Sequence, residues 1–167
     1  TVTGVQTCAL PIFPEFDQVV RRVPLLVTVK GKIYPSLALE TLRVASAENS
    51  TLFIRSSGGS GILSFGTKTG LESVSVQNRT LFTNERGELW LKFSLPQQQR
   101  THSAWELLSD RVNPKDIEGR HILIGSSATG LNDLHATPLS SSAPGVQVHA
   151  ETLEQMLSGD YLIRPAW

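Results

Sequence analysis

Ser126 or Ser127, Asp133 and His135 are the residues of this chain whose types could make a hydrolytic site. A serine nucleophile needs a histidine within hydrogen-bond reach and an acid that orients the histidine. However, the Asp-x-x-His spacing of some esterases and the Gly-x-Ser-x-Gly turn are both absent. A secreted α/β serine hydrolase stays open as an alternative, beside the simpler interpretation that Asp133 caps a turn and His135 hydrogen-bonds within its loop.

The four histidines, His102, His121, His135 and His149, do not form a metal-binding pattern, because they are widely separated and no cysteine stands near them. We therefore expect no metal and no cofactor. His149 falls beside the apolar face of the last predicted helix, where His135 can meet it, so these two form a candidate pH-sensitive pair. Asp133, His135 and His149 are the candidate ligand-binding residues, and no catalytic residue is predicted.

Residues 122–130 look like a strand that leads into a glycine loop, but the features of a nucleotide site are missing. The loop has neither a Gly-Lys-Ser/Thr ending nor a Gly-x-Gly-x-x-Gly pattern, and no helix follows it directly. Equal numbers of basic and acidic residues, 15 of each, give a formal net charge of zero, which disfavours nucleic-acid binding. Arg21 and Arg22 are expected to be solvated charges at a strand edge.

The elements that must position these residues are predicted from the apolar pattern. Residues 23–30 predict a strand, Gly31 and Lys32 a reversal, and Ser36 the N-cap of a helix. From residue 51 to residue 93, short alternating runs separated by turns predict a β-meander. Ser103 and Glu106 have capping-box spacing before a short helix.

Residues 121–124 predict a compact buried strand, and Pro144 suits the start of a last helix that Gly159 ends. The spacing predicts that this helix buries one face and exposes another, with Val146, Ala150, Leu153 and Leu157 inside and Gln147, Glu151, Glu154 and Gln155 outside. The chain is long enough for one domain. We expect an α/β (α+β) domain with a mixed β-sheet, the meander in its middle and a long C-terminal amphipathic helix packed on the sheet.

Residues 1–12 differ from the rest of the chain. They resemble, residue for residue, one reading frame of a common sequencing adapter, and they show no charge and no amphipathic period. We expect this segment, which holds the lone Cys8, not to be natural sequence, and residues 13–167 to be the C-terminal portion of a domain whose start is missing.

The natural part resembles the CHASE-two (CHASE2) domain, the second type of cyclase- and histidine-kinase-associated extracellular sensor. Several separate blocks carry the resemblance, in the family's order: residues 20–25, 36–40, 83–89, 119–133, 144–150 and 157–159, and Arg164 with Pro165. Asp17-Gln18 stands where the family commonly has an Asp-Gly turn.

The resemblance implies a non-catalytic sensor domain on the extracytoplasmic, periplasmic side of a bacterial membrane. In such proteins a membrane segment precedes the domain, and membrane helices with a cytoplasmic cyclase, histidine kinase or Ser/Thr kinase follow it. The stimulus stays open between a small molecule and a protein, and a homodimer of the full-length receptor is consistent with the resemblance. The other alternative is an interaction domain without a ligand.

Overall fold

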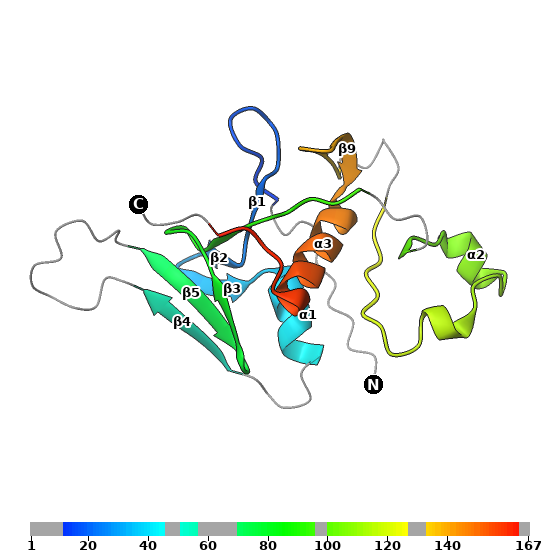
Figure 1. Cartoon of the computed structure of the whole chain (residues 1–167), viewed down its shortest axis with the longest axis horizontal. Coiled ribbons are helices and arrows are strands. Elements are labelled where there is room, and N and C mark those ends of the chain that lie inside the picture. Colours follow the sequence, from blue (N-terminus) through cyan, green and yellow to red (C-terminus); the bar gives the residue numbers. More distant parts are fainter. Residues whose placement is uncertain (1–11, 46–50, 57–69, 96–99, 127–132, 164–167) are drawn as a thin grey trace, which may run out of the picture.

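The computed structural model describes residues 12–45, 51–56, 70–95, 100–126 and 133–163 (Figure 1). The helices and strands are, in chain order, β1 (Arg22–Pro24), β2 (Leu26–Val29), β3 (Lys32–Pro35), α1 (Leu37–Ala45), β4 (Leu52–Ser56), β5 (Leu71–Val76), β6 (Arg79–Phe82), β7 (Glu88–Trp90), α2 (Ala104–Leu108), the short 3₁₀ helix η3 (Pro114–Asp116), β8 (Leu134–Thr137), β9 (Ser140–Pro144) and α3 (Gly145–Ser158). Helices α1 and α3 pack against each other, and small sheets lie around them. The predicted α+β class is confirmed.

The paired strands form several small antiparallel sheets rather than one continuous sheet. β1 pairs with β7, β2 with β3, β8 with β9, and β5 lies between β4 and β6. The last of these sheets confirms the predicted meander over β4, β5 and β6, but β7, which the prediction placed in the same meander, pairs with β1 instead. Among the described residues, the parallel component of the expected mixed sheet is limited to an isolated bridge between Val19 and Ala136.

Local signals in the sequence place several element boundaries correctly. The hairpin turn between β2 and β3 lies at Lys30 and Gly31, one residue before the predicted Gly31-Lys32 reversal, and both residues have the positive φ that such a turn requires, 51° and 76°. The Ser36 hydroxyl accepts a hydrogen bond from the Leu39 N–H at the start of α1. Helix α2 has the predicted capping box, and Gly159 ends α3 with φ 77°.

The hydrophobic core lies where α1 and α3 meet the strands. Its most deeply buried side chains come from segments far apart in the chain and include Val20, Leu25, Leu39, Val74, Leu81, Leu89, Val148 and Met156. Burial of such side chains is the main stabilising contribution to the fold, at about 1.5–3 kcal/mol each. The core therefore joins the N-terminal strands, the meander and α3 into one unit.

The buried face of α3 agrees with the prediction only in part: Leu153 is buried, Leu157 packs against the core and Glu154 is exposed, as expected. Ala150 is exposed, whereas Glu151 and Gln155, predicted to face water, are each only 8% exposed. These polar side chains are buried because they bind the backbone that follows β7. The Gln155 amide accepts from the Lys92 N–H at 2.9 Å and donates to the Lys92 carbonyl at 3.0 Å, and Glu151 accepts from the Ser94 N–H at 3.3 Å. Side chains of α3 thus supply the backbone of residues 92–94 with the hydrogen bonds that a neighbouring strand would otherwise make.

The prediction of a buried strand at residues 121–124 is wrong. Ile122 is 57% and Ile124 is 93% exposed, and none of the strands of the described residues includes this segment. The segment belongs to residues 100–126, whose ends contact α3 through the Arg100–Glu154 ion pair and the close approach of Gly125 to Val146, while α2 projects away from α1 and α3 (Figure 1). A continuous apolar run predicts burial on both faces only if other elements cover it, and the described residues supply none.

Replacing Gln155 by alanine is expected to reduce the free energy of unfolding by about 1–2 kcal/mol, because the Lys92 N–H and carbonyl lose their partners. Urea denaturation followed by circular dichroism measures this change. Glu154→Ala on the same helix is the matched control: its partner is Arg100 in an exposed ion pair, so its loss should cost about 0–1 kcal/mol. Equal losses in the two variants would contradict the structural role of Gln155.

Candidate functional site

Asp133, His135 and His149 lie together at the N-terminal end of α3, and we refer to them as the Asp–His cluster. Asp133 directly precedes β8, and His135 lies within β8, opposite Ala143 of β9. His135 Nε2 is 3.4 Å from Asp133 Oδ1. His149 lies one helical turn after Gly145, the first residue of α3, and its titration is coupled electrostatically to both Asp133 and His135. The structure therefore brings the three predicted candidates into one site.

Gly145 gives the Asp133 carboxylate its place in this cluster. The Gly145 N–H donates to the Asp133 carbonyl at 2.8 Å, which joins the start of β8 to the start of α3. A Cβ atom at position 145 would overlap with the Asp133 carboxylate, most closely with Oδ1. A carboxylate beside the first turn of a helix is favoured by the free N–H groups there. The lack of a side chain at residue 145 thus allows the negative charge to approach α3.

His149 is the buried member of the cluster. It is 8% exposed, and its Nδ1 atom is buried without a hydrogen-bond partner among the described residues. Burial lowers the pKa of His149 most strongly; the Asp133 charge opposes this effect, and His135 adds to it. The neutral imidazole is therefore the favoured form at neutral pH, and acidification would place a positive charge on a buried side chain.

The predicted hydrolytic arrangement is only partly assembled. Asp133 and His135 are in contact, but no hydrogen bond joins Ser126 to His135 in the part of the chain that the structure describes. Ser127 lies outside the described residues. Within the described ranges, no group of three or more His, Cys, Asp or Glu residues has a geometry that could hold a metal ion.

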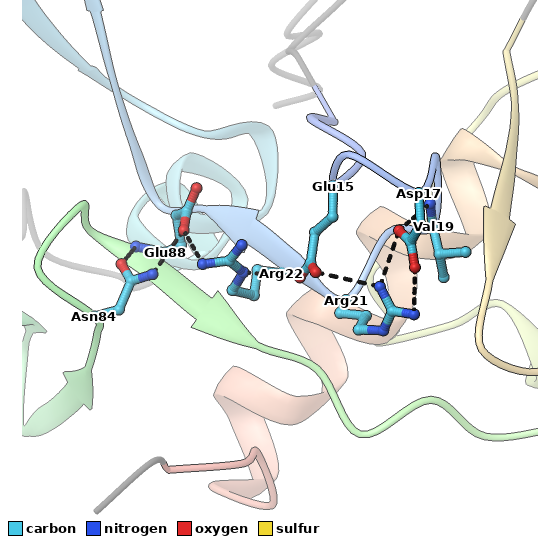
Figure 2. Close-up of polar contacts among 7 residues, drawn as sticks. All are labelled: Glu15, Asp17, Val19, Arg21, Arg22, Asn84 and Glu88. Atoms are coloured by element: carbon cyan, nitrogen blue, oxygen red, sulfur yellow. Dashed lines mark hydrogen bonds and ion pairs between the residues drawn. The ribbon is translucent and has the colours of Figure 1, made fainter. Parts of the chain in front are cut away.

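A second polar group, which the sequence analysis missed, surrounds the two consecutive arginines (Figure 2). Arg21 binds both carboxylate oxygens of Asp17, at 3.1 and 2.8 Å, and Glu15 at 3.2 Å. Arg22 binds Glu15 and Glu88, each at 3.1 Å. The arginines predicted to be solvated edge charges instead connect the turn before β1 with β7. No spacing rule indicates this network from the sequence, because residues 15–21 form a turn and not a helix.

The turn that carries this network has a specific backbone shape. Two hydrogen bonds to its carboxylate lower the pKa of Asp17: the larger effect comes from the Arg21 side chain and the smaller from the Val19 N–H. The ionised form of Asp17 is therefore favoured. Gln18 has φ 64°, a left-handed conformation that glycine adopts most readily. This conformation explains physically why an Asp-Gly turn suits this position in the family that the chain resembles.

A hollow of about 410 Å³ lies beside the network. Phe13, Pro14, Glu15, Phe16, Arg22, Arg86 and Glu88 line it. Its volume is within the range of about 300–1,000 Å³ that small-molecule sites occupy. Phe16 is 96% exposed, so this hollow combines an apolar surface with charged groups of both signs.

The residues after α3, 159–163, form an exit segment that is attached to β7. The Leu162 N–H donates to the Trp90 carbonyl at 3.1 Å. Trp90 also pairs with Arg22 of β1. Lys92 forms an ion pair with Asp160 at 2.9 Å. The Tyr161 hydroxyl accepts from the Phe82 N–H at 3.0 Å, which ties the exit segment to β6 as well. Helix α3 therefore runs from the Asp–His cluster to a fixed exit segment.

Comparison with known proteins gives one family. The family model described as the CHASE2 domain matches residues 5–167. No curated protein and no solved structure matches this chain. The match begins within the segment 1–12 that resembles an adapter; the structure describes only Ile12 of that segment, which is buried in the core. The boundary at residue 12 stays a prediction.

Acidification is expected to destabilise the domain through His149. Because burial lowers the folded-state pKa below the ordinary 6.5, the unfolded chain binds the proton more readily than the folded domain. The contribution of His149 is fully present above pH 6.5 and is lost as the pH falls towards the folded-state pKa. Urea unfolding between about pH 5 and 8 should show this loss in the wild type and a flatter profile in His149→Gln.

A control variant isolates the effect of His149. His102→Gln changes an exposed histidine and should leave the dependence of unfolding free energy on pH unchanged. Glu151 acts with the opposite sign, since burial raises its pKa above the ordinary 4.5 and its contribution is lost as the pH rises through that range. Superimposable profiles for wild type and His149→Gln would show that His149 does not couple folding to pH.

Gly145→Ala is expected to displace the Asp133 carboxylate and to cost about 1 kcal/mol of unfolding free energy, since the new Cβ would overlap with Oδ1. In an Asp133→Ala background the same substitution should be neutral or stabilising by about 0.5–1 kcal/mol, because alanine is the better helix former. A double-mutant cycle measured by chemical denaturation gives the coupling. Additive effects of the two substitutions would rule out the proposed contact.

Proposed function

The chain belongs to the CHASE2 domain family, whose members are extracellular sensory domains, and we propose that it is the input domain of a bacterial membrane signalling receptor. The single observation that carries this proposal is the family match over nearly the whole chain. The family is sensory and non-catalytic, so the chemistry of the receptor belongs to its output domain. We assign that output to a cytoplasmic cyclase, histidine kinase or Ser/Thr kinase.

The periplasmic side of the cytoplasmic membrane is the proposed location. An extracellular family is consistent with that side, and none of the helices in the described ranges is long and apolar enough to span a membrane. The stimulus is then an extracytoplasmic small molecule or protein. A small molecule would have room in the hollow beside the Arg21–Arg22 network, where charged groups of both signs meet an exposed aromatic ring.

Helix α3 is the proposed path of the signal. Its first residue is bonded to Asp133, and the residues after its last turn are bonded to β7 and β6. A stimulus that binds one of two positions of α3 more tightly shifts the population towards that position. The exit segment would then carry the shift to the segments that follow, in the direction of the membrane.

The coupling can be tested in the full-length receptor. Tyr161→Phe removes the hydroxyl that accepts from the Phe82 N–H, without removing the aromatic ring. We expect the basal output activity to change by about threefold or more, the equivalent of roughly 0.7 kcal/mol in the two-state equilibrium. Tyr34→Phe, an exposed tyrosine on β3, is the matched control and should leave the output unchanged.

The extracytoplasmic location can be tested with reporter enzymes fused to the receptor after Gly159. Alkaline phosphatase fused after Gly159 should be active, because that enzyme matures only outside the cytoplasm, where its disulfides form. A β-galactosidase fusion at the same residue should be inactive. The reverse pair of results would refute the extracytoplasmic location, and a wild-type output in Tyr161→Phe would refute the path through the exit segment.

A further inference from the structure

The hollow beside the Arg21–Arg22 network has an apolar part and a charged part. Phe13 and Phe16 line the apolar part, and these two side chains are 55% and 96% exposed. Charged side chains line most of the rest. Small-molecule sites commonly combine aromatic surface with a few polar groups that orient the ligand. The charges that are free to bind therefore decide which ligand this hollow suits.

Most of the charged groups in the hollow already have partners. Arg22 lies between Glu15 and Glu88 and binds a carboxylate oxygen of each at 3.1 Å (Figure 2). Glu15 also accepts from Arg21 at 3.2 Å, and Glu88 accepts from the Asn84 amide at 2.6 Å. A cationic ligand would have to replace these bonds to reach either carboxylate, so the two glutamates are poorly suited to bind one.

Arg86 differs from the other charged residues of the hollow. Its guanidinium has no hydrogen bond or ion pair within the part of the chain that the structure describes. Its backbone is held in the turn before β7, where the Arg86 N–H donates to the Asn84 side-chain oxygen at 3.0 Å. A guanidinium offers paired N–H donors that match the two oxygens of a carboxylate. The unused charge of the hollow is therefore positive and suits a carboxylate.

We propose that the hollow binds a small aromatic carboxylate. Arg86 would bind the carboxylate, and Phe13 and Phe16 would pack against the ring, since pairs of aromatic rings attract each other beyond the effect of the area they bury. The volume of about 410 Å³ is sufficient for a single ring with a short acidic side chain. This inference rests on the proposed function, because it names the chemical class of stimulus that the input domain would receive.

Titration of the purified chain with phenylacetate tests the proposal. Changes in the NMR spectrum should saturate with a dissociation constant of about 1 mM or lower, as expected for so small a ligand. Arg86→Gln should raise this constant by about tenfold or more, because a charge-assisted hydrogen bond is lost. Phe16→Ala should raise it by about threefold or more, because a ring contact is lost. Both side chains are exposed, so neither substitution should unfold the chain.

Matched control variants and ligands separate the two parts of the hollow. Arg55→Gln and Phe53→Ala change an exposed arginine and an exposed phenylalanine on β4, neither of which lines the hollow, and should leave the dissociation constant unchanged. 2-Phenylethanol lacks the carboxylate and acetate lacks the ring, so each should bind at least about tenfold more weakly than phenylacetate. Absence of saturable phenylacetate binding would overturn the proposal. So would equal effects of Arg55→Gln and Arg86→Gln, or tighter binding of the cation 2-phenylethylammonium.

Failure of this inference can be distinguished from failure of the proposed function. The titration reports on the hollow alone, whereas the reporter fusions after Gly159 report on the location alone. Absent binding together with an active alkaline phosphatase fusion would overturn the ligand class and leave the sensory function standing. Binding that Arg86→Gln weakens, together with an inactive fusion, would support the carboxylate site and contradict the extracytoplasmic location.

Discussion

The bonds between α3 and the backbone that follows β7 are the interaction on which the rest of the fold depends. β7 has β1 at one edge and the exit segment at the other, and Leu91 still donates to the Arg21 carbonyl, but Lys92 and Ser94 have no partner strand among the described residues. Gln155 and Glu151 supply the missing hydrogen bonds from a helix. These hydrogen bonds are partly buried, and each contributes about 0.5–1.5 kcal/mol. The sheet edge and the helix therefore fix each other's position, across more than 50 residues of sequence.

Those features of the fold that depend on a few consecutive residues could be predicted from the sequence. The hairpin at Lys30 and Gly31, the capping box at Ser103 and the end of α3 at Gly159 each follow from the backbone preferences of neighbouring residues. The buried face of α3 could not, since a polar residue becomes a core residue only when a distant backbone needs its hydrogen bonds. Helical spacing alone assigns Gln155 to water.

The same distinction applies to the site. The candidates Asp133, His135 and His149 were chosen for their chemistry, and the structure places them together because β8, β9 and α3 follow one another with tight connections. The role of Gly145 was not predicted, as it depends on where the Asp133 carboxylate lies. The wrong prediction at residues 121–124 has a similar cause. An apolar run indicates that a segment can be buried, but it does not indicate which other element packs against it.

The bonds that hold α3 also set the free energy that a signal must supply. In the proposed path, a change at Gly145 would reach the exit segment as a movement of the whole helix, because backbone hydrogen bonds join its successive turns. That movement breaks or exchanges the hydrogen bonds of Gln155 and Glu151, which contribute about 1 kcal/mol each. A stimulus that binds the moved position about a hundredfold more tightly supplies about 2.8 kcal/mol. The two quantities are similar, so the proposed path requires no more free energy than an ordinary ligand can supply.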